Sequence, residues 1–265
     1  MQPPASRRGT FCLYAALLSV PALAQAQAGP PFLANDPGTP GNGNWEINLA
    51  AAPTIGRDAA SYQLPQIDVN FGLGERLQLT FEQPYVLASP AHASTQEGWG
   101  NAYPGLKWRF IDEGEDGWQV SAFPQLETGV SGLAQQRDLG EPGPRYLLPI
   151  EAAHKLGPLD VDVEAGWYVP VHGAHERILG LVAGHTFASH LELDVELYDD
   201  RAAGAPPRQT TLDIGGRYPL HPGIIALFMA GRSVSGTGNG QPLFMGYFGI
   251  QVLLSHYGRT LNGQP

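Results

Sequence analysis

Residues 190–198 read His-Leu-Glu-Leu-Asp-Val-Glu-Leu-Tyr. The odd positions from 191 to 197 are apolar, and the even positions from 192 to 196 are carboxylates. On a β-strand this alternation makes one apolar face and one acidic face, whereas a helix would spread the carboxylates around its axis. The same pattern recurs in residues 66–71, 77–82, 159–165 and 211–214. It therefore predicts an all-β chain.

Strands of this kind follow one another along most of the sequence. We expect twelve, at 44–53, 62–73, 75–87, 101–112, 117–130, 145–156, 158–170, 177–187, 189–199, 209–219, 223–233 and 242–254. Short turns alternate with longer polar loops at 54–61, 88–100, 131–144, 200–208 and 234–241. This alternation is typical of bacterial outer-membrane barrels. The sequence thus predicts a transmembrane antiparallel up-and-down β-barrel, with ten or fourteen strands as alternatives.

The composition excludes several other classes of protein. The net charge of −10 speaks against nucleic-acid binding, because nucleic-acid-binding domains are basic. The single Cys allows neither a disulfide framework nor a cysteine-held metal cluster. Hydrophobic residues make up 43% of the chain, which suffices for an ordered fold. No apolar run after the N-terminal region approaches the roughly 18 residues that a membrane helix needs.

The N-terminal region has the features of an export signal. Arg7 and Arg8 precede an apolar run at 11–24, and small residues follow up to Ala28. We predict a signal peptide at 1–28, cleaved near Ala28. The remaining organisation is a periplasmic or plug-like segment at 29–43, the barrel at 44–257 and a tail at 258–265.

Aromatic side chains fall near the predicted strand ends, as in the girdles of membrane barrels. We expect a periplasmic rim of Trp45, Phe71, Phe110, Trp118, Phe187 and Tyr218, and an outer rim of Tyr85, Tyr103, Tyr146, Trp167, Tyr198 and Phe244.

Two features require adjustments within a barrel. Pro124 and Pro149 lie inside predicted strands, where a missing N–H group calls for a bulge or an earlier strand end. The strands near 177–187 and 223–231 are apolar on both faces. Their inward side chains would have to be covered by a plug or by packing across a narrow lumen.

The acidic faces cannot point toward lipid, where a charge near the midplane costs about 2–4 kcal/mol. We therefore expect the carboxylates to line the lumen. They either pair with basic side chains in a structural network or line a path that favours cations. A calcium site is not expected, because no loop has a known ligand spacing. The predicted lumen residues are Asp68, Glu82, Arg109, Asp160, Asp162, Glu164, Glu192, Asp194, Glu196, Asp213 and Arg217, with Glu46, Lys107, Lys155 and Arg232 as further members.

Two other functions remain as alternatives. His92 and Ser94 are two residues apart, as in barrel-bound lipid hydrolases, where a His activates a Ser nucleophile. This pair lies in a predicted loop without a third orienting group. The second alternative is a soluble periplasmic β-sandwich that binds a ligand. His172 and His175 are close in sequence, but they more simply belong to a turn than to a metal site.

The segment after the predicted cleavage site resembles the start of a bacterial family. It reads Gly29-Pro30-Pro31-Phe32, then Asp36-Pro37, then Trp45-Glu46 at the first strand. It resembles the outer-membrane transporter family that is labelled with the meta-pathway of phenol degradation. Asn35 stands where that family usually has Asp. The resemblance implies an outer-membrane β-barrel for uptake of small molecules, aromatic ones among them, and it provides no catalytic residues.

Together these features predict a pore in the cell outer membrane of a Gram-negative bacterium. Small molecules would cross it by passive diffusion through a constricted acidic lumen. We expect no enzymatic activity, cofactor, metal or nucleic-acid partner. The expected partners are outer-membrane lipid, lipopolysaccharide, the barrel-assembly machinery and an unidentified small molecule.

Overall fold

The computed structural model describes residues 29–265 except 115–116, 189, 203–208, 236–240 and 256–265. The predicted signal peptide at 1–28 and the predicted tail at 258–265 therefore lie outside the described residues.

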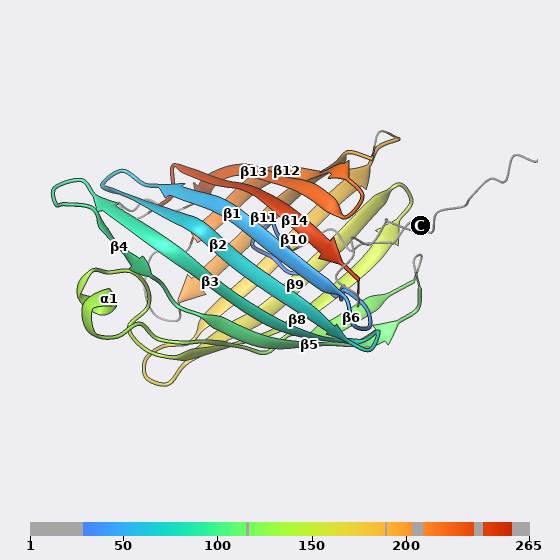
Figure 1. The fold of residues 1–265 in the computed structure, drawn as a ribbon, viewed down its shortest axis with the longest axis horizontal. Helices are drawn as coiled ribbons and strands as arrows, with labels where there is room; N and C mark the ends of the chain where they lie inside the picture. The colour runs from blue at the N-terminus through green and yellow to red at the C-terminus, as the bar shows by residue number, and fades with distance from the viewer. Residues whose placement is uncertain (1–28, 115–116, 189, 203–208, 236–240, 256–265) are drawn as a thin grey trace, which may run out of the picture.

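Twelve antiparallel strands close into a barrel (Figure 1). Closure comes from β1 and β14, which pair with Trp45 opposite Leu254. The strands are β1 (Trp45–Ile55), β2 (Ala59–Leu73), β3 (Leu77–Pro90), β5 (Tyr103–Asp112), β6 (Gln119–Ala122), β8 (Arg145–Leu156), β9 (Leu159–Pro170), β10 (Glu176–Thr186), β11 (Glu192–Ala202), β12 (Gln209–His221), β13 (Ile224–Ser235) and β14 (Phe244–Leu254). The predicted fold class and strand count are confirmed.

Three short elements accompany the barrel. β4 (Gln96–Trp99) pairs with the end of β3, and β7 (Gln125–Glu127) pairs with β5 and β8. The helix α1 (Gly132–Gln136) lies in the connection between β7 and β8. In the part of the chain that the structure describes, no helix is long and apolar enough to cross a membrane.

The two ends of the barrel differ in their connections. We call the end where β1 begins and β14 finishes the turn end, and the opposite end, which carries α1, the loop end (Figure 1). The predicted loop at 54–61 is wrong, because β1 and β2 extend until only 56–58 separates them. The Gly56 N–H group donates to the Ala59 carbonyl at 2.8 Å and closes this turn. The predicted loop at 88–100 likewise contains the end of β3 and all of β4.

The two prolines that the sequence flagged lie at one gap in the sheet. β6 ends and β7 begins around Pro124, so the predicted strand at 117–130 is broken. β8 pairs with β6 at Ile150 and with β7 at Leu147, which leaves Pro149 facing the gap. The strand therefore ends early where the proline removes a donor, as expected from the sequence.

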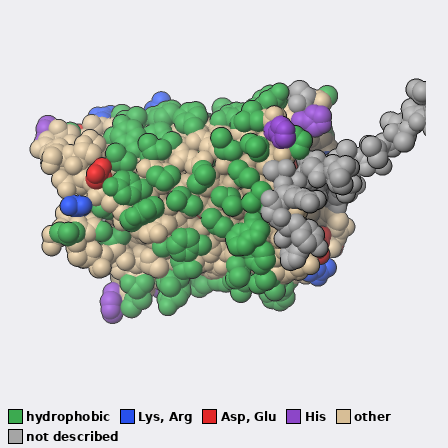
Figure 2. Space-filling view, in the orientation of Figure 1, with side chains coloured by type: hydrophobic (Ala, Val, Ile, Leu, Met, Phe, Trp, Pro, Cys, Tyr) green, Lys and Arg blue, Asp and Glu red, His purple; other side chains and the backbone are tan. Residues whose placement is uncertain are grey.

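The strands expose their apolar side chains and bury their charged ones, which is the reverse of the arrangement in a soluble protein. On β11, Leu193, Val195 and Leu197 are 39–45% exposed, whereas Asp194 and Glu196 are at most 1% exposed. Figure 2 shows apolar side chains over the middle of the visible wall and charged groups near its two ends. A closed barrel with this outer surface suits a lipid environment. The β-sandwich alternative is wrong.

The aromatic side chains predicted for the two rims lie on the outer wall, with two exceptions. Trp118, Phe187 and Tyr218 are exposed on the outer wall near the turn end, and Tyr146 and Trp167 near the loop end. The prediction for Tyr103 and Tyr198 is wrong, because both line the interior. Tyr198 is an even-numbered residue of β11, on the face of Glu196, and Tyr103 lies directly opposite Glu82.

Candidate pore interior

The first described residues enter the barrel. Residues 39–43 contact the turn between β2 and β3, where the Thr39 hydroxyl donates to the Glu75 carbonyl at 2.9 Å. Residues 29–38 continue into the interior, and we call them the plug. The segment predicted at 29–43 thus has two parts, one at the turn end and one inside.

Charged side chains of the wall hold the backbone of the plug. The Glu196 carboxylate accepts hydrogen bonds from the N–H groups of Leu33 at 3.0 Å and Ala34 at 2.7 Å. Glu164 accepts a third from the N–H group of Asn35 at 3.1 Å. Three consecutive backbone donors are thereby bound by two carboxylates from β11 and β9.

Basic side chains bind the carbonyl groups of the plug. The Arg217 guanidinium, from β12, donates to the Pro30 carbonyl at 3.0 Å. The Lys107 ammonium, from β5, donates to the Asp36 carbonyl. The acidic side chains thus accept from the N–H groups of the plug, and the basic side chains donate to its carbonyl groups. Buried backbone groups without such partners would be costly.

Apolar contacts complete the attachment. Phe32 is buried against Leu227, Met229 and Tyr247, and Ala34 packs against Val182 of β10. β10 and β13 are the strands whose inward faces the sequence shows to be apolar. Of the two coverings that the sequence left open, a plug or packing across the lumen, the structure shows Phe32 and Ala34 of the plug against these faces. Gly180 allows the closest approach, because a Cβ atom there would lie 2.5 Å from that of Ala34.

The structure places the predicted lumen residues in two groups. Asp160, Glu192 and Arg109 lie near the turn end. There Glu192 pairs with Arg217 at 2.5 Å, Asp160 with Lys155 at 3.7 Å, and Arg109 with Asp112 at 3.2 Å. The others lie deeper: Asp68, Asp162, Glu164, Asp194, Glu196 and Asp213 are at most 7% exposed, and Glu46 and Glu82 line a cavity.

One predicted basic residue is misplaced, and two acidic residues are additional. Arg232 is exposed near the loop end of β13, on the opposite face from the buried Leu227 and Met229, so its prediction as a lumen residue is wrong. Glu127 and Glu151 are buried and pair with Arg145 at 2.6 Å and Lys107 at 3.4 Å. Neither belongs to an alternating acidic run, so periodicity does not reveal them.

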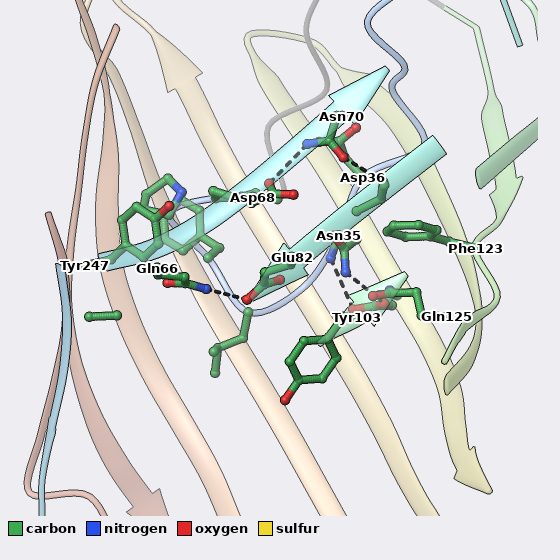
Figure 3. Close-up of a pocket in the computed structure, with 18 of the residues that line it drawn as sticks. Asn35, Asp36, Gln66, Asp68, Asn70, Glu82, Tyr103, Phe123, Gln125 and Tyr247 are labelled. Carbon is green, nitrogen blue, oxygen red and sulfur yellow. Dashed lines mark hydrogen bonds between the residues drawn. The ribbon is translucent and has the colours of Figure 1, made fainter. Parts of the chain in front are cut away.

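A cavity of about 320 Å³ lies beside the plug (Figure 3). Its wall includes residues from Glu46 near the start of β1 to Thr54 near its end, so the cavity extends along the barrel. Its lining combines carboxylates, amides and aromatic rings: Glu46, Gln66, Asp68, Asn70, Glu82, Tyr103, Phe123, Gln125, Tyr168, Tyr198 and Tyr247.

The hydrolase alternative has no supporting geometry. His92 and Ser94 are both exposed beyond the end of β3. The Ser94 hydroxyl accepts from Gln96 at 3.1 Å, and no hydrogen bond to His92 is present among the described residues. The same part of the chain contains no group of three or more His, Cys, Asp or Glu side chains suited to a metal ion, and His172 and His175 are exposed.

No family model and no curated protein matches the sequence. Solved structures do match the fold. The KdgM porin superposes with a TM-score of 0.55 at 12% identity, over 78% of this chain and 98% of that one. An outer-membrane channel from Pseudomonas putida F1 has a TM-score of 0.60 at 13% identity, over 80% and 94%. The NanC porin has a TM-score of 0.53 at 10% identity, over 78% and 98%. The chain thus has the barrel fold found in outer-membrane porins and channels.

Proposed function

We propose that this chain is an outer-membrane pore which small molecules cross by passive diffusion, and which its own N-terminal plug narrows. The observation that carries the proposal is the plug itself, held inside a closed barrel by Glu164, Glu196, Lys107 and Arg217. A segment anchored by side chains from several strands obstructs the axis of the barrel. Its release would open a path between the two ends.

The outer wall and the N-terminal sequence support the location. Exposed apolar side chains surround the barrel, and a charge there would cost about 2–4 kcal/mol at the bilayer midplane. The predicted signal peptide would deliver the chain to the periplasm, from which outer-membrane barrels assemble. Lipid, lipopolysaccharide and the barrel-assembly machinery are the partners that such a location entails.

The width of the barrel supports a constricted path. Barrels of about eight strands are filled by side chains, whereas those of about 16–18 strands hold open water channels. Twelve strands lie between these cases. The plug reduces the remaining space further, and the cavity of about 320 Å³ is what stays beside it.

The charge of the interior supports a preference for cations. Buried carboxylates outnumber the basic side chains Lys107 and Arg217, which are themselves engaged with the plug and with Glu151 and Glu192. A low-dielectric wall focuses the field of such charges along the lumen. The KdgM porin was also solved in complex with oligogalacturonate, which is a polyanion. An acidic interior would repel a cargo of that kind.

The cargo that we propose is small and uncharged or positively charged, with aromatic molecules included. Tyrosine rings line the cavity, and the sequence resemblance described above implies uptake of aromatic molecules. On the same resemblance we propose that this chain belongs to the outer-membrane transporter family that is labelled with the meta-pathway of phenol degradation.

Conductance in planar lipid bilayers tests the proposal. We expect deletion of residues 30–42 to raise the single-channel conductance of the purified protein. Unchanged conductance would mean that the segment does not restrict flow. A deletion variant that folds but conducts nothing would overturn the pore.

A further inference from the structure

Three carboxylates gather on the cavity wall formed by β1, β2 and β3. Asp68 and Glu82 lie directly opposite each other in the register of β2 and β3, and Glu46 lies on β1. All three line the cavity. Figure 3 shows Asp68 and Glu82 on neighbouring strands, with the rings of Tyr247 and Tyr103 near them.

The partners of these carboxylates are neutral. Asp68 Oδ2 accepts from the amide groups of Asn48 at 2.9 Å and Asn70 at 3.0 Å, and Glu82 accepts from Gln66 at 2.6 Å. Asp68 is 7% exposed, and its Oδ1 atom has no hydrogen-bond partner. Amide donors bind a carboxylate but leave its charge uncompensated, which is costly in a buried site.

Some of the other interior carboxylates have basic partners. Glu151 pairs with Lys107 at 3.4 Å, and Glu192 pairs with Arg217 at 2.5 Å. Within the described ranges, neither Lys nor Arg forms a salt bridge with Glu46, Asp68 or Glu82. These three carboxylates therefore lack the salt bridges that Glu151 and Glu192 form, although Lys107 also lines the cavity.

Aromatic rings in the cavity lining provide surfaces on which a cation can bind. The Lys107 ammonium lies 4.7 Å from the centre of the Phe123 ring, and the Arg145 guanidinium lies 4.3 Å from that of Tyr168. Both rings line the cavity, so its walls already receive cations from the chain itself. Tyr103 and Tyr247 line the same space beside Asp68 and Glu82, which have no basic partner among the described residues.

We propose that this cavity is a binding site for a small organic cation, a protonated amine carried by a single aromatic ring. The ammonium group binds between Asp68 and Glu82, and the ring packs against Tyr103 and Tyr247. Ligand sites usually measure about 300–1,000 Å³, so a cavity of about 320 Å³ admits one small ring system. The inference names a substrate class for the proposed pore and to that extent rests on it.

A matched series of probes tests the site on the wild-type chain in detergent micelles. We expect 2-phenylethylamine, protonated at pH 7, to bind saturably with one molecule per chain in isothermal titration calorimetry. We expect 2-phenylethanol, which has the same ring and length without the charge, to bind at least about tenfold more weakly. Phenylacetate should not bind. Equal affinity for the alcohol and the amine, or binding of phenylacetate, would overturn the proposal.

Variants locate the site within the barrel. We expect Asp68→Asn and Glu82→Gln each to weaken amine binding at least about tenfold, because each removes one charge and little volume. Asp58→Asn is the control for a lost charge, since Asp58 is exposed in the turn between β1 and β2. Asp58→Asn should bind the amine like the wild type, and undiminished amine binding by both Asp68→Asn and Glu82→Gln would overturn the assignment. If one buried variant fails to fold, the other variant and the probe series still decide.

The binding and conductance experiments distinguish a failure of the proposed binding site from a failure of the proposed pore. Amine binding by a protein that never conducts, even without residues 30–42, would overturn the pore and leave the binding site standing. Conduction without selective amine binding would overturn the binding site and leave the pore standing.

Discussion

Glu196 provides the most informative perturbation of the plug. Its two carboxylate oxygens each accept one backbone N–H group, from Leu33 at 3.0 Å and from Ala34 at 2.7 Å. Glu196→Gln leaves a single acceptor oxygen, so one of these buried donors loses its partner. The new amide nitrogen can instead donate to Asp213, which lies opposite Glu196 and whose Oδ1 atom has no partner. The wall therefore stays intact while the plug is held less firmly.

The expected effect of Glu196→Gln on the release of the plug follows from the free energy of the lost hydrogen bond. A hydrogen bond to a charged group contributes about 1.5–3 kcal/mol, and we take about 2 kcal/mol for this one. That difference shifts the equilibrium between the inserted and the released plug roughly thirtyfold toward release. In single-channel recordings, the fraction of time spent in the high-conductance state should rise by the same factor while that state remains rare.

Asp194→Asn is the matched control for this variant. Asp194 lies two residues from Glu196 on the same face of β11 and is 1% exposed, yet it forms no hydrogen bond with the plug in the part of the chain described. The Asp194→Asn protein should spend the same fraction of time in the high-conductance state as the wild type. The reasoning is refuted if Glu196→Gln gates like the wild type while the deletion of residues 30–42 opens the pore, or if Asp194→Asn opens it equally.

Three further variants test separate parts of the account. Gly180→Val should displace the plug by steric conflict with Ala34 and raise the conductance toward that of the deletion variant; wild-type conductance would contradict this contact. Leu197→Arg, on the outer face of β11, should destabilise the barrel in lipid vesicles by about 2–4 kcal/mol in urea unfolding, and Leu197→Phe should be near neutral. Neutralising both Asp162 and Asp194 to Asn should bring the cation-to-anion permeability ratio closer to unity, as reversal potentials would measure; an unchanged ratio would mean that these carboxylates do not influence permeation.

Strand alternation is strong enough in this chain to predict the barrel and much of its interior. From Asp160 to Glu164 on β9 and from Glu192 to Glu196 on β11 every second residue is acidic, and the side chains between them are apolar, so both faces are defined by sequence alone. The apolar inward residues of β10 and β13 even indicate that something must cover them. Phe32 and Ala34 of the plug do so.

The remaining features depend on contacts between distant residues. Glu127 and Glu151 lie on strands whose pattern Pro124 and Pro149 disturb, so their inward direction follows from pairing rather than from periodicity. Tyr103 lies inward because β5 pairs with β3 in the register that sets it opposite Glu82. The path of the plug has no periodic signal, because it follows from side chains of several strands that meet only in the closed barrel.

The reversal potential of the protein lacking residues 30–42, measured across a planar bilayer under a KCl gradient, tests the central claim most directly. It asks whether the barrel is a pore once the plug is gone and whether its acidic interior controls the ions that pass. We expect a conducting channel whose reversal potential has the sign of cation selectivity. Selection of anions, or a folded barrel that conducts nothing, would contradict the account.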